Sequence, residues 1–402
     1  MTSQNAGGGN AILVINAGSS SLKFSVFRES GAGGLRVTIN GQISGIGTEP
    51  KFEAKDAAKN PLAERVWAAG EPSDRTALLA FLLEWIEGRL DGAKLLAAGH
   101  RVVHGGTRHA APVLLTPAVM EELESFIPLA PLHQPHNLAA IRALAEAHPE
   151  LPQVACFDTA FHRGQPWQSQ MFAIPRELTD EGVRRYGFHG LSYEYIARRL
   201  PELAPELADG RVVVAHLGSG ASMCAIHAGR SVDSTMGFTA LDGLPMGTRC
   251  GNIDPGVLIY LMRQKGMGAD AIEKLLYNKS GLLGVSGLSN DMRALLDSED
   301  PHAEEAVELF CFRIAKETGA LAASMGGIDA LVFTAGIGER SAPVRARVGD
   351  KLAWLGVILD PAANEANGPL ISAPNSRIPV YVIPTDEEQM IALHSRKALE
   401  TA

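Results

Sequence analysis

Five side chains in this 402-residue sequence lie in glycine-containing segments or beside apolar runs, and their types can bind anions or divalent cations. Arg101 lies in GHRVVHGG, His189 in YGFHG and Arg249 in MGTRCG, while Asp158 follows the apolar run VACF and Glu387 lies in PTDEE. A guanidinium group binds a carboxylate or a phosphate through paired hydrogen bonds. Carboxylates hold divalent cations. The set predicts chemistry on an anionic group.

The sequence predicts three glycine-rich turns after apolar runs, and these turns could hold phosphates. They read NAGSSS at 16–21, HLGSGAS at 216–222 and TAGIGERS at 334–341. Glycine lets backbone N–H groups approach an anion closely, and hydroxyl side chains add donors. A plain tight turn is the alternative for each segment alone, but three together favour a nucleoside triphosphate. None of them contains a Walker A motif or a convincing Rossmann fingerprint.

Apolar runs alternate with segments of helical spacing, which predicts an α/β protein. An internal sequence repeat supports a duplication, because residues 13–27 align with residues 213–227 at an offset of 200. In this alignment Gly18 and Ser19 match Gly218 and Ser219. Each copy reads as a strand, a turn and a second strand. A repeat at half the chain length predicts two related domains.

Composition excludes several classes of protein. The net charge of -9 argues against nucleic acid as a partner, since its phosphates attract basic surfaces. The four cysteines form no CxxC pair, which argues against a disulfide framework or a zinc site. No apolar stretch reaches the roughly 18 residues of a membrane span. Residues 1–10 lack a signal pattern and are expected to be a disordered lead-in. A cytoplasmic protein is expected.

Longer motifs resemble those of acetate kinases. They are VINAGSSSLKF, GHRVVHGG, FDTAFH, RRYGFHG, MGTRCGNIDPG, FTAGIGE and PTDEE, in order across residues 11–392. The resemblance implies a duplicated, ribonuclease H-like fold of the actin-type ATPases, with the active site in the interdomain cleft. It implies an N-terminal domain at 11–158, on which helix 388–402 packs back, and a nucleotide-binding domain at 159–387.

The implied reaction is reversible phosphoryl transfer from ATP to acetate, giving acetyl phosphate and ADP. Acetate is ionised at pH 7, so its attack on phosphorus needs no general base. The obstacle is charge repulsion, which positioning and cationic groups relieve. The resemblance makes Asp158, His189 and Arg249 catalytic, with Asp158 orienting rather than removing a proton. It places the substrate at Arg101, Val103 and Leu132. The alternative for Arg101 is a surface salt bridge without a role in catalysis.

Metal and nucleotide residues are carried over from the same motifs. Asn16 and Glu387 are expected to hold Mg²⁺, or Mn²⁺, although Glu388 could exchange roles with Glu387. ATP or ADP is expected at Lys23, His216, Leu217, Gly218, Ser219, Gly220, Asp291, Met292, Arg293, Gly336, Ile337, Gly338, Glu339 and Arg340. The resemblance also suggests a homodimer.

Other functions remain open from the sequence. They are a propionate or butyrate kinase of the same superfamily, a sugar-type kinase with Asp158 as general base, and an actin-like ATPase. The sequence departs from the family pattern at Ser219, at Arg340 and at Ala240, where proline is usual. Alanine is smaller than proline, so a somewhat roomier acyl pocket is expected.

Overall fold

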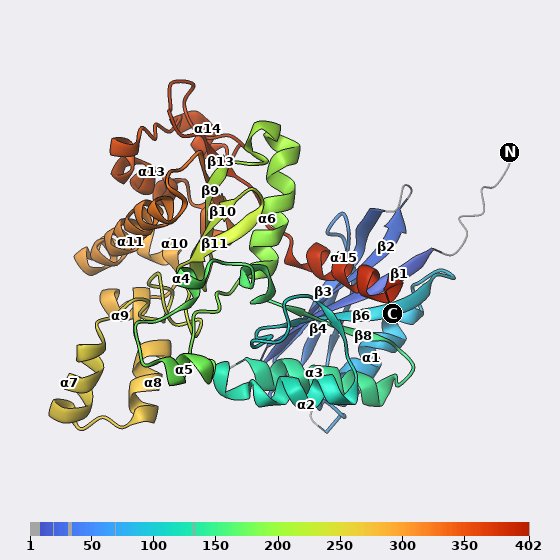
Figure 1. The fold of residues 1–402 in the computed structure, drawn as a ribbon. Coiled ribbons are helices and arrows are strands. Elements are labelled where there is room, and N and C mark those ends of the chain that lie inside the picture. Colours follow the sequence, from blue (N-terminus) through green and yellow to red (C-terminus); the bar gives the residue numbers. More distant parts are fainter. Residues whose placement is uncertain (1–8, 19, 31–33, 69, 132, 402) are drawn as a thin grey trace, which may run out of the picture. The chain divides into compact units, whose positions relative to one another are not determined.

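The protein forms two compact units. The computed structural model describes residues 9–401 except 19, 31–33, 69 and 132. The first unit ends at Ala160 and takes in the C-terminal segment from Asp386, and the second unit is Phe161–Thr385. Figure 1 shows the sheet and helices of each unit.

The unit boundaries differ by two residues from those expected from the sequence. Glu387, which we assigned to the second domain, belongs to the first unit. It opens α15 (Glu387–Glu400), whose N-cap Asp386 accepts a hydrogen bond from the backbone of Gln389 at 2.8 Å. The helix packs against β1, β6 and β8 of the first sheet. The first turn of this helix therefore belongs with the unit that its body covers.

The first unit is built on an eight-stranded sheet in the order β5-β4-β3-β2-β1-β6-β8-β7, in which β1, β6 and β8 run parallel. The strands are β1 (Asn10–Ala17), β2 (Ser21–Ser30), β3 (Gly34–Ser44), β4 (Lys51–Asp56), β5 (Pro61–Val66), β6 (Lys94–Val102), β7 (Val113–Leu114) and β8 (Gln153–Phe157). The other helices are α1 (Arg75–Glu87), α2 (Pro117–Ser125), η2 (Ile127–Leu129) and α3 (Gln134–Ala147).

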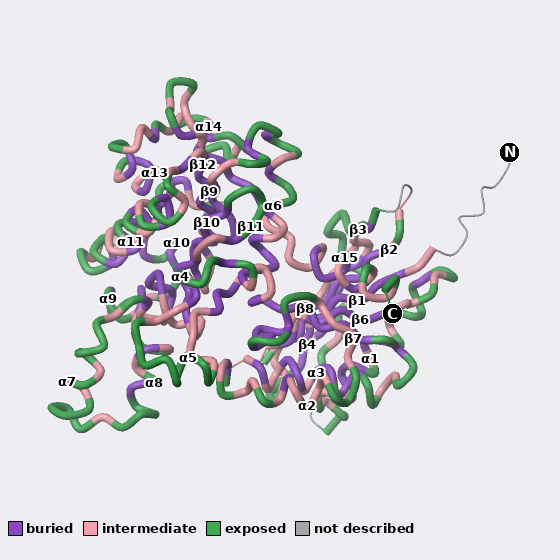
Figure 2. The backbone as a smooth tube through the Cα atoms, viewed as in Figure 1, coloured by how far each residue is buried: buried purple, intermediate pink, exposed green. Residues whose placement is uncertain are grey.

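Local sequence explains where these helices begin and which face they bury. Asp74 caps α1 by accepting from the backbone of Ala77, and Thr116 caps α2 with Pro117 in its first turn. Helix α1 buries its leucine-rich face against the sheet, where Phe52 stacks on Phe24 and meets Trp85 edge-on. Figure 2 shows continuous buried stretches along the central strands, such as β1 and β8.

The second unit contains a five-stranded sheet in the order β11-β10-β9-β12-β13. Its strands are β9 (Arg211–Leu217), β10 (Ala221–His227), β11 (Arg230–Ser234), β12 (Ala330–Thr334) and β13 (Val380–Val382). Its helices are α4 (Trp167–Gln170), α5 (Arg176–Asp180), α6 (Gly190–Leu203), η4 (Pro205–Leu207), α7 (Pro255–Lys265), α8 (Ala269–Asn278), α9 (Gly281–Ser286), α10 (Met292–Leu296), α11 (Pro301–Met325), α12 (Ala335–Arg340), α13 (Ala342–Lys351), η5 (Ala353–Leu355) and α14 (Pro361–Glu365). The short segment η3 (Ala160–His162) lies at the boundary between the units.

The two sheets share one topology. Strands β3-β2-β1-β6-β8 of the first sheet correspond to β11-β10-β9-β12-β13 of the second, with an antiparallel meander followed by two parallel strands in both. The first and second glycine segments each join the first two strands of this pattern. The α/β class and the duplicated topology predicted from the sequence are confirmed.

The third glycine segment is not a turn. After β12 the chain enters α12 directly, with Thr334 at the N-cap and Ala335 at φ 63°. The expectation of a turn here was wrong, because glycine residues after a strand are also compatible with the start of a helix. No helix in the described part of the chain is long and apolar enough to span a membrane.

Candidate active site

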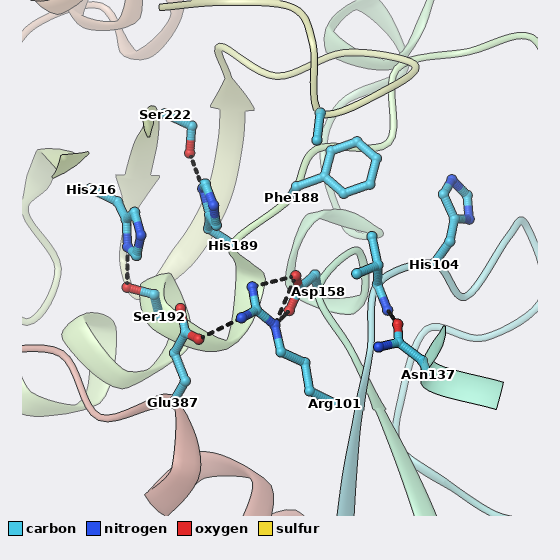
Figure 3. A network of polar contacts seen from close by, with 12 residues as sticks. Arg101, His104, Asn137, Asp158, Phe188, His189, Ser192, His216, Ser222 and Glu387 are labelled. Carbon is cyan, nitrogen blue, oxygen red and sulfur yellow. Dashed lines mark hydrogen bonds and ion pairs between the residues drawn. The ribbon is translucent and has the colours of Figure 1, made fainter. Parts of the chain in front are cut away.

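An arginine held by two carboxylates forms the polar centre of the first unit. Arg101 is near the end of β6 and Asp158 directly follows β8, and these strands are parallel neighbours. Arg101 donates from Nε to Asp158 Oδ1 at 3.0 Å and from Nη2 to Asp158 Oδ2 at 2.8 Å. Its Nη1 lies 3.2 Å from Oε2 of Glu387 on α15 (Figure 3). Side chains at the carboxyl ends of parallel strands gather at one edge of a sheet, where ligands bind.

Because the ion pair is buried, Arg101 and its carboxylate partners stabilise each other's charged forms. The Asp158 side chain is only 3% exposed and that of Arg101 19%. Burial opposes the charge of Arg101, but the two carboxylates outweigh it and raise the pKa of the guanidinium. Burial raises the pKa of Asp158, and Arg101 works against that rise. Asp158 therefore holds the guanidinium of Arg101 and offsets part of its charge.

The segment after Arg101 is held by helix α3. Asn137 accepts from the backbone N–H of Val103 at 3.2 Å and donates to the carbonyl of Ala17 at 2.8 Å, so it joins the ends of β6 and β1. Gln134 accepts from the backbone N–H of His104 at 3.2 Å and donates to its carbonyl at 3.1 Å. The sequence analysis missed both amides, whose only signal was a polar residue in the first turn of an apolar helix. The predicted substrate residue Leu132 lies outside the described residues.

The predicted metal residues are both in the first unit. Asn16 stands opposite Lys23 in the β1–β2 pair, and Glu387 contacts Arg101. Its neighbour Glu388 accepts a hydrogen bond from Ser25 instead, and burial raises the pKa of Glu388. The geometry thus gives the two glutamates different partners. Among the described residues no group of three or more His, Cys, Asp or Glu side chains is arranged to hold a metal ion.

In the second unit His189 and Arg249 converge on one glycine. A Cβ atom added to Gly220, in the β9–β10 turn, would lie 3.4 Å from Nε2 of His189 and 3.7 Å from Nη1 of Arg249. Arg249 also donates from Nη1 to the carbonyl of Ala240 at 3.0 Å. Burial lowers the pKa of Arg249, but an arginine remains charged at neutral pH. A cation and an imidazole nitrogen therefore face one turn.

The loop that carries Arg249 needs a glycine beside it. Gly281 has φ +62°, and a Cβ there would lie 2.1 Å from the carbonyl oxygen of Met246 and 2.7 Å from that of Arg249. The backbone of Leu282 in turn donates to the Met246 carbonyl at 2.8 Å. The start of helix α9 thus fixes the backbone around Arg249.

His189 itself has a strained backbone with two supports. It is the N-cap of α6 at φ 57°, ψ 25°, a left-handed conformation that is unfavourable for a side chain with a Cβ. On the ring, Nδ1 lies 2.8 Å from Oγ of Ser222. On the backbone, Nε2 of the buried His162 lies 2.9 Å from the carbonyl of Phe188, the preceding residue. Because a carbonyl only accepts, His162 carries its proton on Nε2.

Two buried histidines predict that stability falls in mild acid. Burial lowers the pKa of His100 and of His162 to about 4. Between the unfolded value near 6.5 and about 4, the unfolded chain takes up protons that the folded chain does not. The free energy of unfolding should fall by about 1.4 kcal/mol per pH unit for each histidine in that window, and this loss should be absent above pH 7.

Chemical denaturation of the parent and of His162→Gln at pH 7, 6 and 5 measures this effect. The variant lacks one titrating group, so the pH dependence of its unfolding free energy should be shallower by about one proton. Equal dependences in the two proteins would contradict the assignment to His162.

A cavity of about 770 Å³ lies within the second unit and brings together eight of the predicted nucleotide residues. They are Gly218, Ser219, Asp291, Met292, Arg293, Gly336, Ile337 and Arg340. Asn290, Leu296, Asp297, Ser341, Pro343 and Arg347 also line it and were not predicted. Its size suits a nucleotide, since small-molecule sites usually measure several hundred Å³.

Six predicted nucleotide residues do not line this cavity. Lys23 is exposed on β2 in the other unit. His216 and Leu217 are buried in β9, and Gly220 faces His189 and Arg249. The remaining two, Gly338 and Glu339, are residues of α12 itself.

Glu339 and Gly338 hold α12 in place rather than facing the cavity. Oε1 of Glu339 accepts from the backbone N–H of Ala335 at 2.9 Å and of Thr385 at 3.1 Å. The carbonyl of Gly338 accepts from Nη1 of Arg345 at 2.9 Å. Arg345 is fully buried, and its other nitrogens bind Asn364. Sequence reasoning did not find Arg345, because arginines are rarely buried.

Comparison with known proteins assigns the chain to a family. The sequence profile of the Acetokinase family matches residues 11–393. The chain belongs to the acetokinase family. It is 56% identical to an acetate kinase of Nitrobacter hamburgensis, over 97% of this chain and 96% of that protein. It is 55% identical to an acetate kinase of Rhodopseudomonas palustris, over 96% and 97% of the two chains.

Solved structures of similar proteins agree. The acetate kinase of Porphyromonas gingivalis matches with a TM-score of 0.86 and 37% identity, over 97% of this chain and all of that chain. A propionate kinase of Francisella tularensis matches with a TM-score of 0.88 and 37% identity, over 96% and 98% of the two chains. The family and the fold predicted from the sequence are confirmed. As an acetokinase, the protein is a kinase that transfers a phosphoryl group to a carboxylate.

Proposed function

We propose that this acetokinase transfers the γ-phosphoryl group of ATP to acetate, reversibly and by direct in-line attack of the carboxylate. The observation that carries the proposal is the convergence of His189 Nε2 and Arg249 Nη1 on Gly220. The same turn contributes Gly218 and Ser219 to the 770 Å³ cavity. Relatives named acetate kinase at 54–56% identity support acetate as the acceptor.

The proposed chemistry needs no proton removed from the acceptor. Acetate is ionised at neutral pH, and its oxygen attacks phosphorus while the β–γ bridging bond to ADP breaks. Charge accumulates on the equatorial oxygens of the phosphoryl group in transit. Arg249 would stabilise this charge as a cation, and His189 would donate a hydrogen bond from Nε2. Asp158 fixes Arg101, which binds the carboxylate end of the acceptor or the phosphoryl group of acetyl phosphate.

Substrate and nucleotide roles extend to the remaining predicted residues. Val103, whose backbone is held by Asn137, would line the acyl site with Leu132. The nucleotide would occupy the cavity between the β9–β10 turn, α10 and α12. Its phosphates would lie toward Gly218 and Ser219, and Lys23 would add a charge near them.

Mg²⁺ would accompany the nucleotide. The oxygen donors of Asn16 and Glu387 are the type that Mg²⁺ prefers, and this ion usually takes only one or two protein carboxylates because phosphates and water fill its other positions. The lack of a three-ligand cluster among the described residues is compatible with such a site. The bound ion would neutralise phosphate charge.

We also infer a homodimer located in the cytoplasm, with small-molecule substrates and neither nucleic acid nor membrane as partners. The net charge of -9 supports the absence of nucleic acid. The dimer is inferred from family resemblance alone, and light scattering of the purified protein tests it.

Hydroxylamine trapping tests the reaction. The protein is incubated with ATP, MgCl₂ and acetate, propionate or butyrate, and the acyl phosphate formed is measured as its hydroxamate. We expect hydroxamate from acetate, with a lower kcat/KM for propionate, and none without Mg²⁺. Higher kcat/KM for propionate would favour the propionate kinase alternative. ATP hydrolysis without any hydroxamate would contradict the proposal and favour an ATPase.

A further inference from the structure

A chain of three hydrogen-bonding groups leads from the core of the second unit to His189. The hydroxyl of Tyr193, on the first turn of α6, lies 2.5 Å from Oγ of Ser222 on β10. The same Oγ lies 2.8 Å from Nδ1 of His189, as Figure 3 shows for these two residues. Tyr193 and Ser222 are both fully buried.

Counting hydrogens decides how this chain is oriented. Ser222 has one hydroxyl hydrogen and can accept two more hydrogen bonds. A phenol is more acidic than an alcohol, so Tyr193 is the better donor of the pair. If Tyr193 donates to Ser222, then the hydrogen of Ser222 is free to point at Nδ1 of His189. An Nδ1–H would leave the buried hydrogen of Ser222 without an acceptor in this chain, so Nδ1 accepts and the proton of the neutral ring lies on Nε2.

A second chain of the same form supports this orientation. Thr385 donates from Oγ1 to Oγ of Ser192 at 2.8 Å, and Ser192 lies 2.8 Å from Nδ1 of His216. The same count puts the proton of His216 on Nε2. The rings of His189 and His216 are stacked, with centroids 4.2 Å apart and planes 16° from parallel. Two imidazolium charges at that separation would repel each other, so the stack favours neutral rings.

The nitrogen that receives the proton is the one that faces the site. Nε2 of His189 is the ring nitrogen 3.4 Å from a Cβ added to Gly220, beside Nη1 of Arg249. A ring with its proton on Nδ1 would present a lone pair there and would repel a phosphoryl oxygen. Proton position on this one ring therefore decides whether His189 can donate.

We propose that Tyr193 and Ser222 are positioning residues that hold the proton of His189 on Nε2, so that the ring donates to the phosphoryl oxygen. This inference rests on the proposed function, because it assigns the hydrogen bond its acceptor. Neither residue was among those predicted from the sequence.

NMR of the full-length protein with ¹⁵N-labelled histidine reads the proton position directly, through two-bond correlations from the ring carbons to each ring nitrogen. His189→Gln identifies the signal. In the parent we expect a neutral ring with its proton on Nε2. In Ser222→Ala the ring loses the hydroxyl that donates to Nδ1, so no donor holds the proton on Nε2. A fraction with the proton on Nδ1 should appear.

Kinetics supply the second readout. Tyr193→Phe should lower kcat by about 2- to 10-fold, the equivalent of one neutral hydrogen bond, with little change in the KM values. Ser222→Ala should lower kcat further. Tyr186→Phe is the matched control, because it removes a phenol hydroxyl that donates to the carbonyl of Gly182 at 2.8 Å and leaves Ser222 in place. It should keep the parent's kcat and proton position.

The outcomes separate this inference from the proposed function. A parent ring with its proton on Nδ1 overturns the inference, and so does a Ser222→Ala protein with the parent's proton position or a Tyr193→Phe protein with the parent's kcat. A ring with its proton on Nε2 that shifts in Ser222→Ala supports the inference even if no hydroxamate forms from any carboxylate. That last result would contradict only the proposed function.

Discussion

Replacing Arg249 with alanine should lower kcat by about 10²- to 10³-fold while the KM values for acetate and ATP change much less. Arg249 is partly buried, and its Nη1 faces Gly220 beside Nε2 of His189. A charge-stabilising group of this kind acts on charge that develops only in the transition state, and removing one such group costs rates of that size. Steady-state kinetics with the hydroxamate assay measure both parameters.

Two further variants define what the loss means. Arg249→Lys keeps a positive charge but loses the planar fork, so it should recover only part of kcat. Arg263→Ala removes an exposed arginine from the last turn of α7, outside the site, and should behave as the parent. A change confined to KM in Arg249→Ala would show that the residue binds the ground state instead.

Sequence reasoning found the fold because its signals are local and repeated. The β1–β2 and β9–β10 pairs each contain an apolar strand, a glycine turn and a second strand, and the structure gives both the same place in equivalent sheets. The helix caps at Asp74 and Thr116 are likewise local, since each accepts from a backbone N–H in the first turn of its own helix. Such features need no knowledge of distant contacts.

The supports of the candidate site could not be predicted in the same way. Ser222 meets His189 across 33 residues, and Asn137 meets Ala17 across 120. Serine, asparagine and glutamine are common, and no spacing marks the few that hold a backbone or a ring. The third glycine segment shows the opposite limit, because its residues are compatible with both a turn and the short helix that the structure contains.

The contacts of Arg101 also bear on whether Asp158 could act as a general base. Asp158 and Glu387 both use carboxylate oxygens on one guanidinium, with Asp158 almost fully buried and Glu387 less so. An acid that removed a proton from a hydroxyl acceptor would need a free oxygen directed at it. Both oxygens of Asp158 are engaged by Arg101, which argues against the sugar-type kinase mechanism.

Removing Asp158 should therefore damage stability and substrate binding together. Asp158→Ala leaves the guanidinium of Arg101 in a buried position with Glu387 as its remaining carboxylate. Breaking a buried pair in this way costs about 3–5 kcal/mol of unfolding free energy. Asp158→Asn keeps the shape and one acceptor oxygen, so it should be less destabilised. Its kcat/KM for acetate should fall by about 10- to 100-fold, as for a lost charge-assisted hydrogen bond.

The double variant Arg101→Met with Asp158→Leu separates the two effects. It removes both charges and fills the space with apolar groups, and such replacements of buried pairs are often neutral for stability. Chemical denaturation should therefore show an unfolding free energy well above that of Asp158→Ala. The hydroxamate assay should nevertheless find almost no activity with acetate, because the guanidinium that binds the carboxylate is gone. A stable double variant that kept the parent's kcat/KM would reduce Arg101 and Asp158 to a structural ion pair.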